Sequence, residues 1–244
     1  VAHDVVKPTG AASLTDADVT RAGFTAFNST PIDPRIRIFG PGATVAQDLE
    51  PEYIAVSHDS RTAWVTLQEN NAIAIVDLTR KKVTSLVALG VKDHSIAGYG
   101  LDGGRDDGGN NIRTWPVLGM YQPDAIATFR HGSRTYLVTA NEGDVREYDG
   151  LNEAGIETVE VEDIALDPIA FPSAATLQSR PLGIARLKVT SVNGDVDNDG
   201  DYDQLYSFGG RSFSIWAEDG TLVFDSGDAL ERIAAAAYPA NFNA

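Results

Sequence analysis

Pro51-Glu-Tyr-Ile-Ala-Val-Ser-His-Asp-Ser-Arg-Thr-Ala-Trp-Val-Thr-Leu-Gln-Glu-Asn-Asn71 is matched later in the chain by Pro123-Asp-Ala-Ile-Ala-Thr-Phe-Arg-His-Gly-Ser-Arg-Thr-Tyr-Leu-Val-Thr-Ala-Asn-Glu-Gly143. In both stretches a proline and a carboxylate open a strand, a polar turn follows, and a second strand carries an aromatic residue. Short strands joined by polar turns and repeated in a fixed order predict an all-β fold, a β-propeller of four-stranded blades. Each unit buries one face against its neighbour, so an isolated unit is not expected to be stable.

A weaker third copy of the unit runs from Pro181 to Ser212, and residues 211–217 repeat the alternating strand pattern of residues 71–77. Long inserts over residues 89–120 and 148–178 lengthen the repeat, and Asp228 is expected to cap a short helix ending at Ala237. Three or four blades do not close a propeller of the usual four to eight. We therefore expect residues 1–244 to be one propeller domain or part of a larger one. The remaining blades of a longer chain, or another copy, would then be its partners.

The composition restricts the partners of the chain. The 35 acidic side chains outnumber the 19 basic ones and give a net charge of −16, which disfavours nucleic acid and anionic membranes as partners. The absence of cysteine excludes thiolate catalysis, disulfides and zinc–thiolate sites. No apolar run approaches the roughly 18 residues of a membrane span, so no membrane insertion is expected. An acidic surface poor in lysine fits a salty or calcium-bearing exterior and, nearly as well, an acidic cytosolic protein. We expect an extracellular, periplasmic or cell-surface location.

Five aspartates alternate with other residues over 195–203, as Asp195, Asp197, Asp199, Asp201 and Asp203. On an extended chain they would all lie on one face and repel one another. A bound Ca²⁺ removes this repulsion, because it takes six to eight oxygen ligands, and Gly200 allows the turn around the ion. Apolar stretches on both sides predict that the loop lies within a β-hairpin. The alternative is a solvated acidic turn without a metal.

Several long motifs resemble the choice-of-anchor I family of secreted β-propellers. They include Asp48-Leu-Glu-Pro-Glu-Tyr-Ile-Ala-Val-Ser57, Gly119-Met-Tyr-Gln-Pro-Asp-Ala-Ile-Ala127, Val138-Thr-Ala-Asn-Glu-Gly-Asp144 and Tyr206-Ser-Phe-Gly-Gly-Arg-Ser-Phe-Ser-Ile-Trp216. This family includes bacterial proteins labelled alkaline phosphatases and mesenchyme-specific cell-surface glycoproteins of biomineralising animals. Its members are longer, so the resemblance implies further blades outside residues 1–244.

Loops at equivalent repeat positions carry carboxylates, and a propeller gathers such positions at its central channel. The carboxylates are Glu50, Glu52, Asp124, Glu142 and Asp144. Gathered without basic partners, they would bind cations or have raised pKa values. Alternatively, each carboxylate caps backbone amides or braces two blades.

The resemblance to family members labelled alkaline phosphatases implies that such a channel could hydrolyse phosphoesters. Glu52, Asp124, Glu142 and Arg211 are the candidate catalytic residues, with Glu50 and Asp144 as metal ligands beside the aspartate loop. Bound Ca²⁺ would polarise a small phosphoester, and Arg211, or Arg146, would hold its phosphate oxygens. Arg211 could instead form an ion pair with Glu142 or Asp144.

Two classes of function are consistent with these observations. The first is a secreted Ca²⁺-binding propeller that hydrolyses phosphomonoesters. The second is a non-catalytic module that binds Ca²⁺ for adhesion, matrix contact or mineral contact at the cell surface. An ester or lactone hydrolase on the same scaffold is a third alternative.

Overall fold

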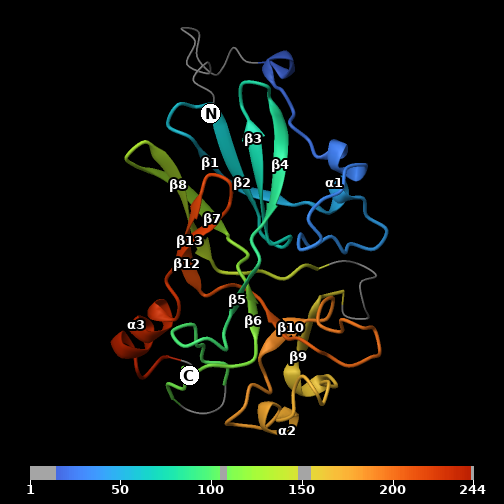
Figure 1. The fold of residues 1–244 in the computed structure, drawn as a ribbon, viewed down its shortest axis with the longest axis vertical. Coiled ribbons are helices and arrows are strands. Elements are labelled where there is room, and N and C mark those ends of the chain that lie inside the picture. Colours follow the sequence, from blue (N-terminus) through green and yellow to red (C-terminus); the bar gives the residue numbers. More distant parts are fainter. Residues whose placement is uncertain (1–14, 105–108, 148–154, 243–244) are drawn as a thin grey trace.

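The computed structural model describes residues 15–104, 109–147 and 155–242, which form mainly β-strands with a few short helices (Figure 1). This confirms the all-β class predicted from the sequence. The first sheet is an antiparallel meander in the order β1-β2-β3-β4. Its strands are β1 (Pro51–Val56), β2 (Thr62–Leu67), β3 (Ala72–Asp77) and β4 (Lys82–Ala88).

The second sheet has the order β13-β12-β8-β7 and corresponds to the second copy of the repeat. A segment of about 70 residues separates β8 from β12, yet the two strands pair from Ser212 opposite Asn141 to Ala217 opposite Tyr136. Arg211 precedes β12 with a φ of 52°, as Asn71 precedes β3 with a φ of 53°. The sequence match between these two strands is therefore confirmed. The bounds are β7 (Ala125–His131), β8 (Arg134–Asn141), β12 (Ser212–Ala217) and β13 (Leu222–Asp225).

Strands from the two inserts and from residues 188–207 form a third sheet in the order β5-β6-β11-β10-β9, in which β6 and β11 are parallel. The predicted third copy of the repeat is therefore wrong as a separate unit. Its first part lies in this mixed sheet, whereas its last strand, β12, completes the second sheet. The strands are β5 (Val91–Asp93), β6 (Leu118–Met120), β9 (Thr158–Glu160), β10 (Lys188–Thr190) and β11 (Tyr206–Ser207).

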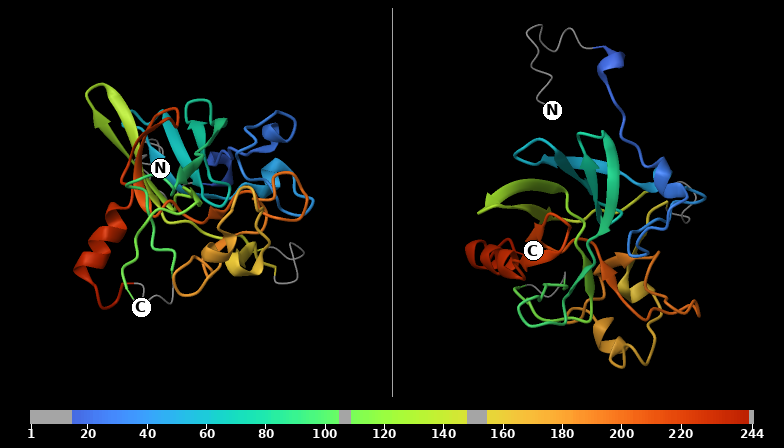
Figure 2. Two further views of the ribbon diagram at one scale, coloured as in Figure 1. Left: turned by 60° about the horizontal axis from the view of Figure 1, so that its bottom comes forward. Right: turned by 45° about the horizontal axis from the view of Figure 1, so that its top comes forward.

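The first two sheets lie side by side, with the mixed sheet below them (Figure 2). At their junction the Thr128 hydroxyl of β7 donates a hydrogen bond to the Val56 carbonyl of β1 at 3.0 Å. Strand β3 is buried on both faces because its side chains alternate between two cores. Ile73 packs with Trp64 and Trp216 between the sheets. Ala74 packs in a second core with Ile36 and Leu49, from the segment that precedes β1. A third core, around Leu101 and Val117, holds the inserts together.

Two buried ion pairs tie residues 37 and 48, which precede β1, to residues before and within the second insert. The guanidinium of Arg37 pairs with Glu157, and that of Arg146 pairs with Asp48 at 2.8 Å. Both guanidiniums also contact the ring of Phe39, that of Arg37 at 4.5 Å and that of Arg146 at 5.0 Å from the ring centre. Charges this deeply buried require partners, so the ion pairs hold these two segments in register.

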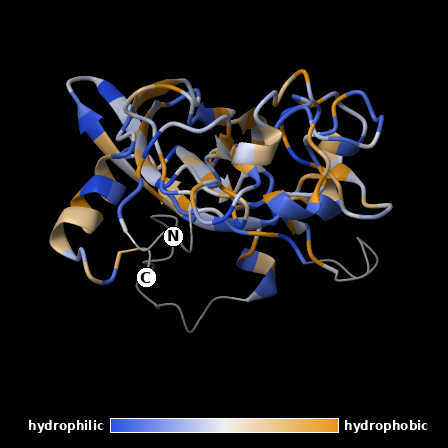
Figure 3. Cartoon of the chain, turned by 90° about the horizontal axis from the view of Figure 1, so that it is seen from below, coloured by the Kyte–Doolittle hydropathy of each residue, from blue (hydrophilic) through white to orange (hydrophobic). Residues whose placement is uncertain are grey.

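The helices are short, and α3 (Ala229–Ala237) is the longest. It confirms the predicted C-terminal helix, but the Asp228 carboxylate accepts a hydrogen bond from the Arg232 side chain rather than capping the helix. In Figure 3 this helix is largely apolar, and Leu230 and Ile233 are exposed on it. No described helix is long and apolar enough to cross a membrane. The shorter helical turns are η3 (Asp16–Asp18), η4 (Thr25–Asn28), α1 (Val45–Asp48), η5 (Val161–Asp163) and α2 (Ala174–Leu177).

Gly209 lies between β11 and β12, where its backbone packs closely against the loop that follows β8. Its φ is 77°, and a Cβ added there would lie 1.9 Å from the Glu142 carbonyl oxygen. We expect Gly209→Ala to lower the free energy of unfolding by about 2–3 kcal/mol, because backbone must move as well as adopt a strained φ. Urea denaturation measures this. Gly132→Ala is the matched control, since Gly132 also has a positive φ but faces open space; equal losses for both variants would contradict the steric explanation.

Among the residues that the structure describes, the three sheets do not close into a ring of blades. The described part of the chain forms two antiparallel four-stranded sheets beside a mixed sheet of inserts.

Candidate metal centre

The aspartate loop lies in a β-hairpin, as its flanking sequences predict. Strands β10 and β11 pair antiparallel, with Val189 opposite Ser207, and the loop connects them. The hairpin belongs to the mixed sheet, between β6 of the first insert and β9 of the second.

Backbone amides hold two of the loop's carboxylates in place. Asp195 accepts hydrogen bonds from the amides of Asp199 at 3.2 Å and Gly200 at 3.1 Å, and Asp203 accepts one from Val196 at 2.7 Å. Gly200 has a φ of 102°, which lets the chain turn where an L side chain would be strained. The loop therefore folds around its own carboxylates.

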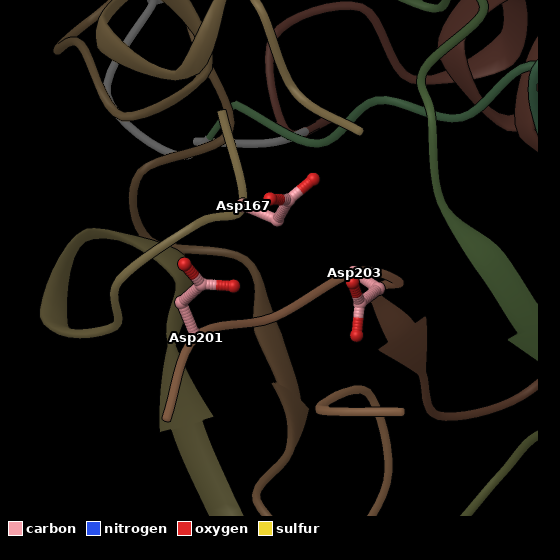
Figure 4. Close-up of side chains that lie close together, drawn as sticks. All are labelled: Asp167, Asp201 and Asp203. Atoms are coloured by element: carbon pink, nitrogen blue, oxygen red, sulfur yellow. The ribbon is translucent and has the colours of Figure 1, made fainter. Parts of the chain in front are cut away.

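The carboxylates form two groups that share Asp203. Asp195, Asp197 and Asp203 each offer an oxygen within 4.8 Å of the others, and so do Asp167, Asp201 and Asp203 (Figure 4). Asp199 is in neither group and accepts a hydrogen bond from the Asp201 amide at 3.2 Å. The five aspartates thus do not face one way, because the turn at Gly200 divides them.

Neighbouring negative charges and, for Asp201 above all, desolvation raise the pKa of two of these carboxyls. The pKa of Asp197 is raised mainly by the charge of Asp199, and that of Asp201 by desolvation and then by Asp199 and Asp167. A cation at the loop would offset this repulsion. Oxygen-only donors suit a hard ion such as Ca²⁺ better than a transition metal.

Asp167 is a candidate ligand that sequence reasoning missed. A parallel bridge between Leu166 and Tyr202 brings it to the loop, and its amide donates to the Tyr202 carbonyl at 3.0 Å. Its carboxylate also accepts from the amide of Ile169 at 3.0 Å. Asp167 lies 28 residues before Asp195 in an insert without repeat pattern, so spacing gave no signal for it.

A second group of carboxylates gathers where β1 and β7 begin. The pKa of Glu52 is raised by desolvation and by the charges of Asp124, Asp144 and Glu50. These four residues were predicted to converge. The structure adds Glu69, in the loop between β2 and β3, where burial and the charges of Glu50 and Glu52 raise its pKa to about 7.

Glu142 and Arg211 lie elsewhere, in a cavity of about 480 Å³ beside α3. Arg211 pairs with Glu231 at 2.9 Å, not with Glu142 or Asp144. Arg146 is buried, and its guanidinium bonds the Asp48 carboxylate and carbonyl, both at 2.8 Å. Arg211 is therefore engaged by Glu231, and Arg146 by Asp48 with a longer contact of 3.7 Å to Glu50. The four predicted catalytic residues fall into two places.

The geometry describes an all-β domain with an oxygen-only candidate cation site. Residues 4–244 match the family model of the choice-of-anchor I domain, and the chain belongs to this family.

Two curated relatives are similar to parts of the chain. Mesenchyme-specific cell surface glycoprotein of Strongylocentrotus purpuratus is 30% identical over 231 residues, covering 82% of this chain and 28% of that protein. Gigasin-3a of Magallana gigas is 40% identical over 62 residues, covering 25% of this chain and 21% of that protein. The chain thus spans less than a third of either relative.

Among solved structures, hydrazine synthase of Kuenenia stuttgartiensis is 11% identical, with a TM-score of 0.24 over 75% of this chain and 38% of that chain. That likeness is too low to support an argument about the fold.

Proposed function

We propose that this chain is a Ca²⁺-binding module of an extracellular surface protein, with the aspartate loop as its metal centre. The observation that carries the proposal is the pair of three-carboxylate groups around Asp203. The family assignment and the name of the sea urchin relative indicate an extracellular surface protein. Calcium is abundant in that setting, and the loop supplies the hard oxygen ligands that it takes.

The repeated sheets support a further part of the proposal. In a longer chain the first two sheets would be blades of a β-propeller, with the mixed sheet as an elaboration between them. Both are four-stranded and antiparallel, and they share the conformation that precedes the third strand. A structure of a longer protein in which the sheets belong to no ring would contradict this assignment.

Removing one shared ligand tests the metal centre. Asp203→Asn is expected to weaken Ca²⁺ binding at least about tenfold, since Asp203 belongs to both carboxylate groups. Isothermal titration calorimetry with Ca²⁺ and with Mg²⁺ measures the affinity. Saturation at a hundred times the Kd should stabilise the wild type by about 2.7 kcal/mol, and chelation should reverse this.

Asp163→Asn is the matched control, because it removes one exposed carboxylate outside the loop. It is expected to leave the affinity unchanged. Equal Ca²⁺ binding by wild type and Asp203→Asn would overturn the proposed centre.

The alternative of phosphomonoester hydrolysis has less support from the geometry, because Arg211 is paired with Glu231. Neither the sea urchin nor the oyster relative is called a phosphatase. We expect no Ca²⁺-dependent hydrolysis of p-nitrophenyl phosphate at alkaline pH. Turnover that falls with chelator, and with both Glu52→Gln and Arg211→Ala, would instead establish the enzyme.

A further inference from the structure

Five carboxylates from four segments of the first two sheets gather where β1 and β7 begin, and we call them the Glu69 cluster after their buried member. Glu50 and Glu52 come from the start of β1, Glu69 from the β2–β3 loop, Asp124 from the start of β7, and Asp144 from the segment after β8. None of these residues belongs to the aspartate loop, which lies in the mixed sheet.

Glu69 has an unsatisfied oxygen inside this cluster. The residue is 7% exposed, and among the described residues its Oε2 is a buried atom without a hydrogen-bond partner. A buried carboxylate oxygen without a partner is costly and rare in native proteins. Its neighbours Glu50 and Glu52 are acceptors when ionised, so they cannot satisfy it.

The surroundings favour a cation as the missing partner. Two guanidiniums border the cluster, and both are already paired. That of Arg37 bonds the Glu157 carboxylate and the Glu69 carbonyl, and that of Arg146 bonds Asp48, with its Nε 3.7 Å from Glu50 Oε2. Two arginines that pair with Glu157 and Asp48 do not balance five further carboxylates. Oxygen ligands without nitrogen or sulfur select a hard divalent ion.

We propose that the Glu69 cluster binds a second divalent cation, with the Glu69 carboxylate as its inner ligand and Glu50 and Glu52 as its outer ligands. The described carboxylates of this cluster are not gathered within 4.8 Å as those of the aspartate loop are. The outer side chains therefore rotate inward onto the ion. Glu50 is 43% exposed and Glu52 is exposed, and exposed side chains change rotamer within nanoseconds.

The site would lie at the junction of the two repeated sheets. Glu50, Glu52 and Glu69 come from the first sheet and its loops, whereas Asp124 and Asp144 flank strands of the second. The ion would be held by the first sheet, beside the junction of β1 and β7, where the charges of Asp124 and Asp144 add to its attraction.

The test uses a protein in which the aspartate loop is already disabled. Asp203→Asn is expected to retain Ca²⁺ binding at the Glu69 cluster by isothermal titration calorimetry. Adding Glu69→Gln should weaken that remaining binding at least about tenfold, because the amide has lost the charge that a hard cation requires. Adding Glu142→Gln instead should leave it unchanged, since Glu142 occupies the matching loop of the second repeat but is exposed and lies outside the cluster.

A second measurement locates the ion directly. Crystals soaked in Mn²⁺ should show anomalous density beside Glu69 in the wild type and none there in Glu69→Gln. Unchanged binding after Glu69→Gln, or no binding left in Asp203→Asn, would overturn the second site. Unchanged binding in Asp203→Asn relative to wild type would instead overturn the aspartate-loop centre alone, so the two failures are distinguishable.

Discussion

Arg37→Met is expected to lower the free energy of unfolding by about 3–5 kcal/mol, because it leaves a fully buried carboxylate without its cationic partner. Arg37 bonds both oxygens of Glu157 and also donates to the Glu69 carbonyl at 2.9 Å. The other donors to Glu157 are the Arg146 amide at 3.0 Å and the Thr190 hydroxyl at 2.7 Å, and neither carries a positive charge at the bonded atom. Urea denaturation of the chain measures the change.

Arg35→Met is the matched control two residues away. Arg35 pairs with Asp33 on the surface, where its side chain is 66% exposed, and surface pairs contribute little. The double variant Arg37→Met/Glu157→Gln should recover part of the loss, since it removes both charges from the interior. Equal stability of the Arg37→Met and Arg35→Met variants would show that the buried pair does not hold the insert.

His94→Asn is expected to remove a pH dependence of about 3 kcal/mol between pH 6.5 and pH 4. Burial lowers the pKa of His94 from 6.5 to about 4, and its Nδ1 lies 2.6 Å from the Tyr99 carbonyl oxygen, to which it donates. Between pH 6.5 and pH 4 the imidazole of His94 is therefore protonated in the unfolded chain but neutral in the folded chain. The stability from this residue is complete above pH 6.5 and is lost as the pH falls through 4. Asparagine keeps a donor for Tyr99 but does not titrate.

The titration of Glu69 changes the free energy of unfolding with pH in the opposite sense to that of His94. The His94→Asn variant must therefore be compared with a control variant at each pH. Its pKa is raised from 4.5 to about 7, and its contribution is complete below pH 4.5 and lost as the pH rises through 7. His58→Asn is the control, because His58 is exposed in the turn between β1 and β2. In chelator, the difference in unfolding free energy between the two histidine variants should change across pH 6.5 to 4. A constant difference would contradict the assignment.

The repeat in the sequence predicted the first three strands of the first sheet and the first three of the second, because their alternation is local. It could not show that β12 pairs with β8 across a long insert, since that pairing depends on tertiary contacts. The β10–β11 hairpin was recognised as a pair of strands, but its place beside β6 in a parallel arrangement has no local signature.

In the candidate sites, too, local spacing could be read from the sequence, whereas tertiary contacts could not. Aspartate spacing located the loop, whereas Asp167 reaches it only through the Leu166–Tyr202 bridge. Glu69 and Glu142 end matching sequence units, yet one is buried and the other exposed. After Glu142 the chain leaves for the insert, whereas after Glu69 it turns directly into β3. Burial of a repeated residue thus depends on the path that the chain takes after the repeat ends.

Because β12 follows β8 by about 70 residues, the first sheet can form before the second while the chain is being synthesised. All four strands of the first sheet have been made once Ala88 has been translated, but β8 must wait for Ser212 before its second neighbour exists. Until then an unpaired strand edge is available to other nascent chains, which is a known route to aggregation. Closing so long a loop also slows folding. We expect the slowest folding step to be the arrival of the β12–β13 hairpin, and a chaperone that shields β8 to raise the yield of folded protein.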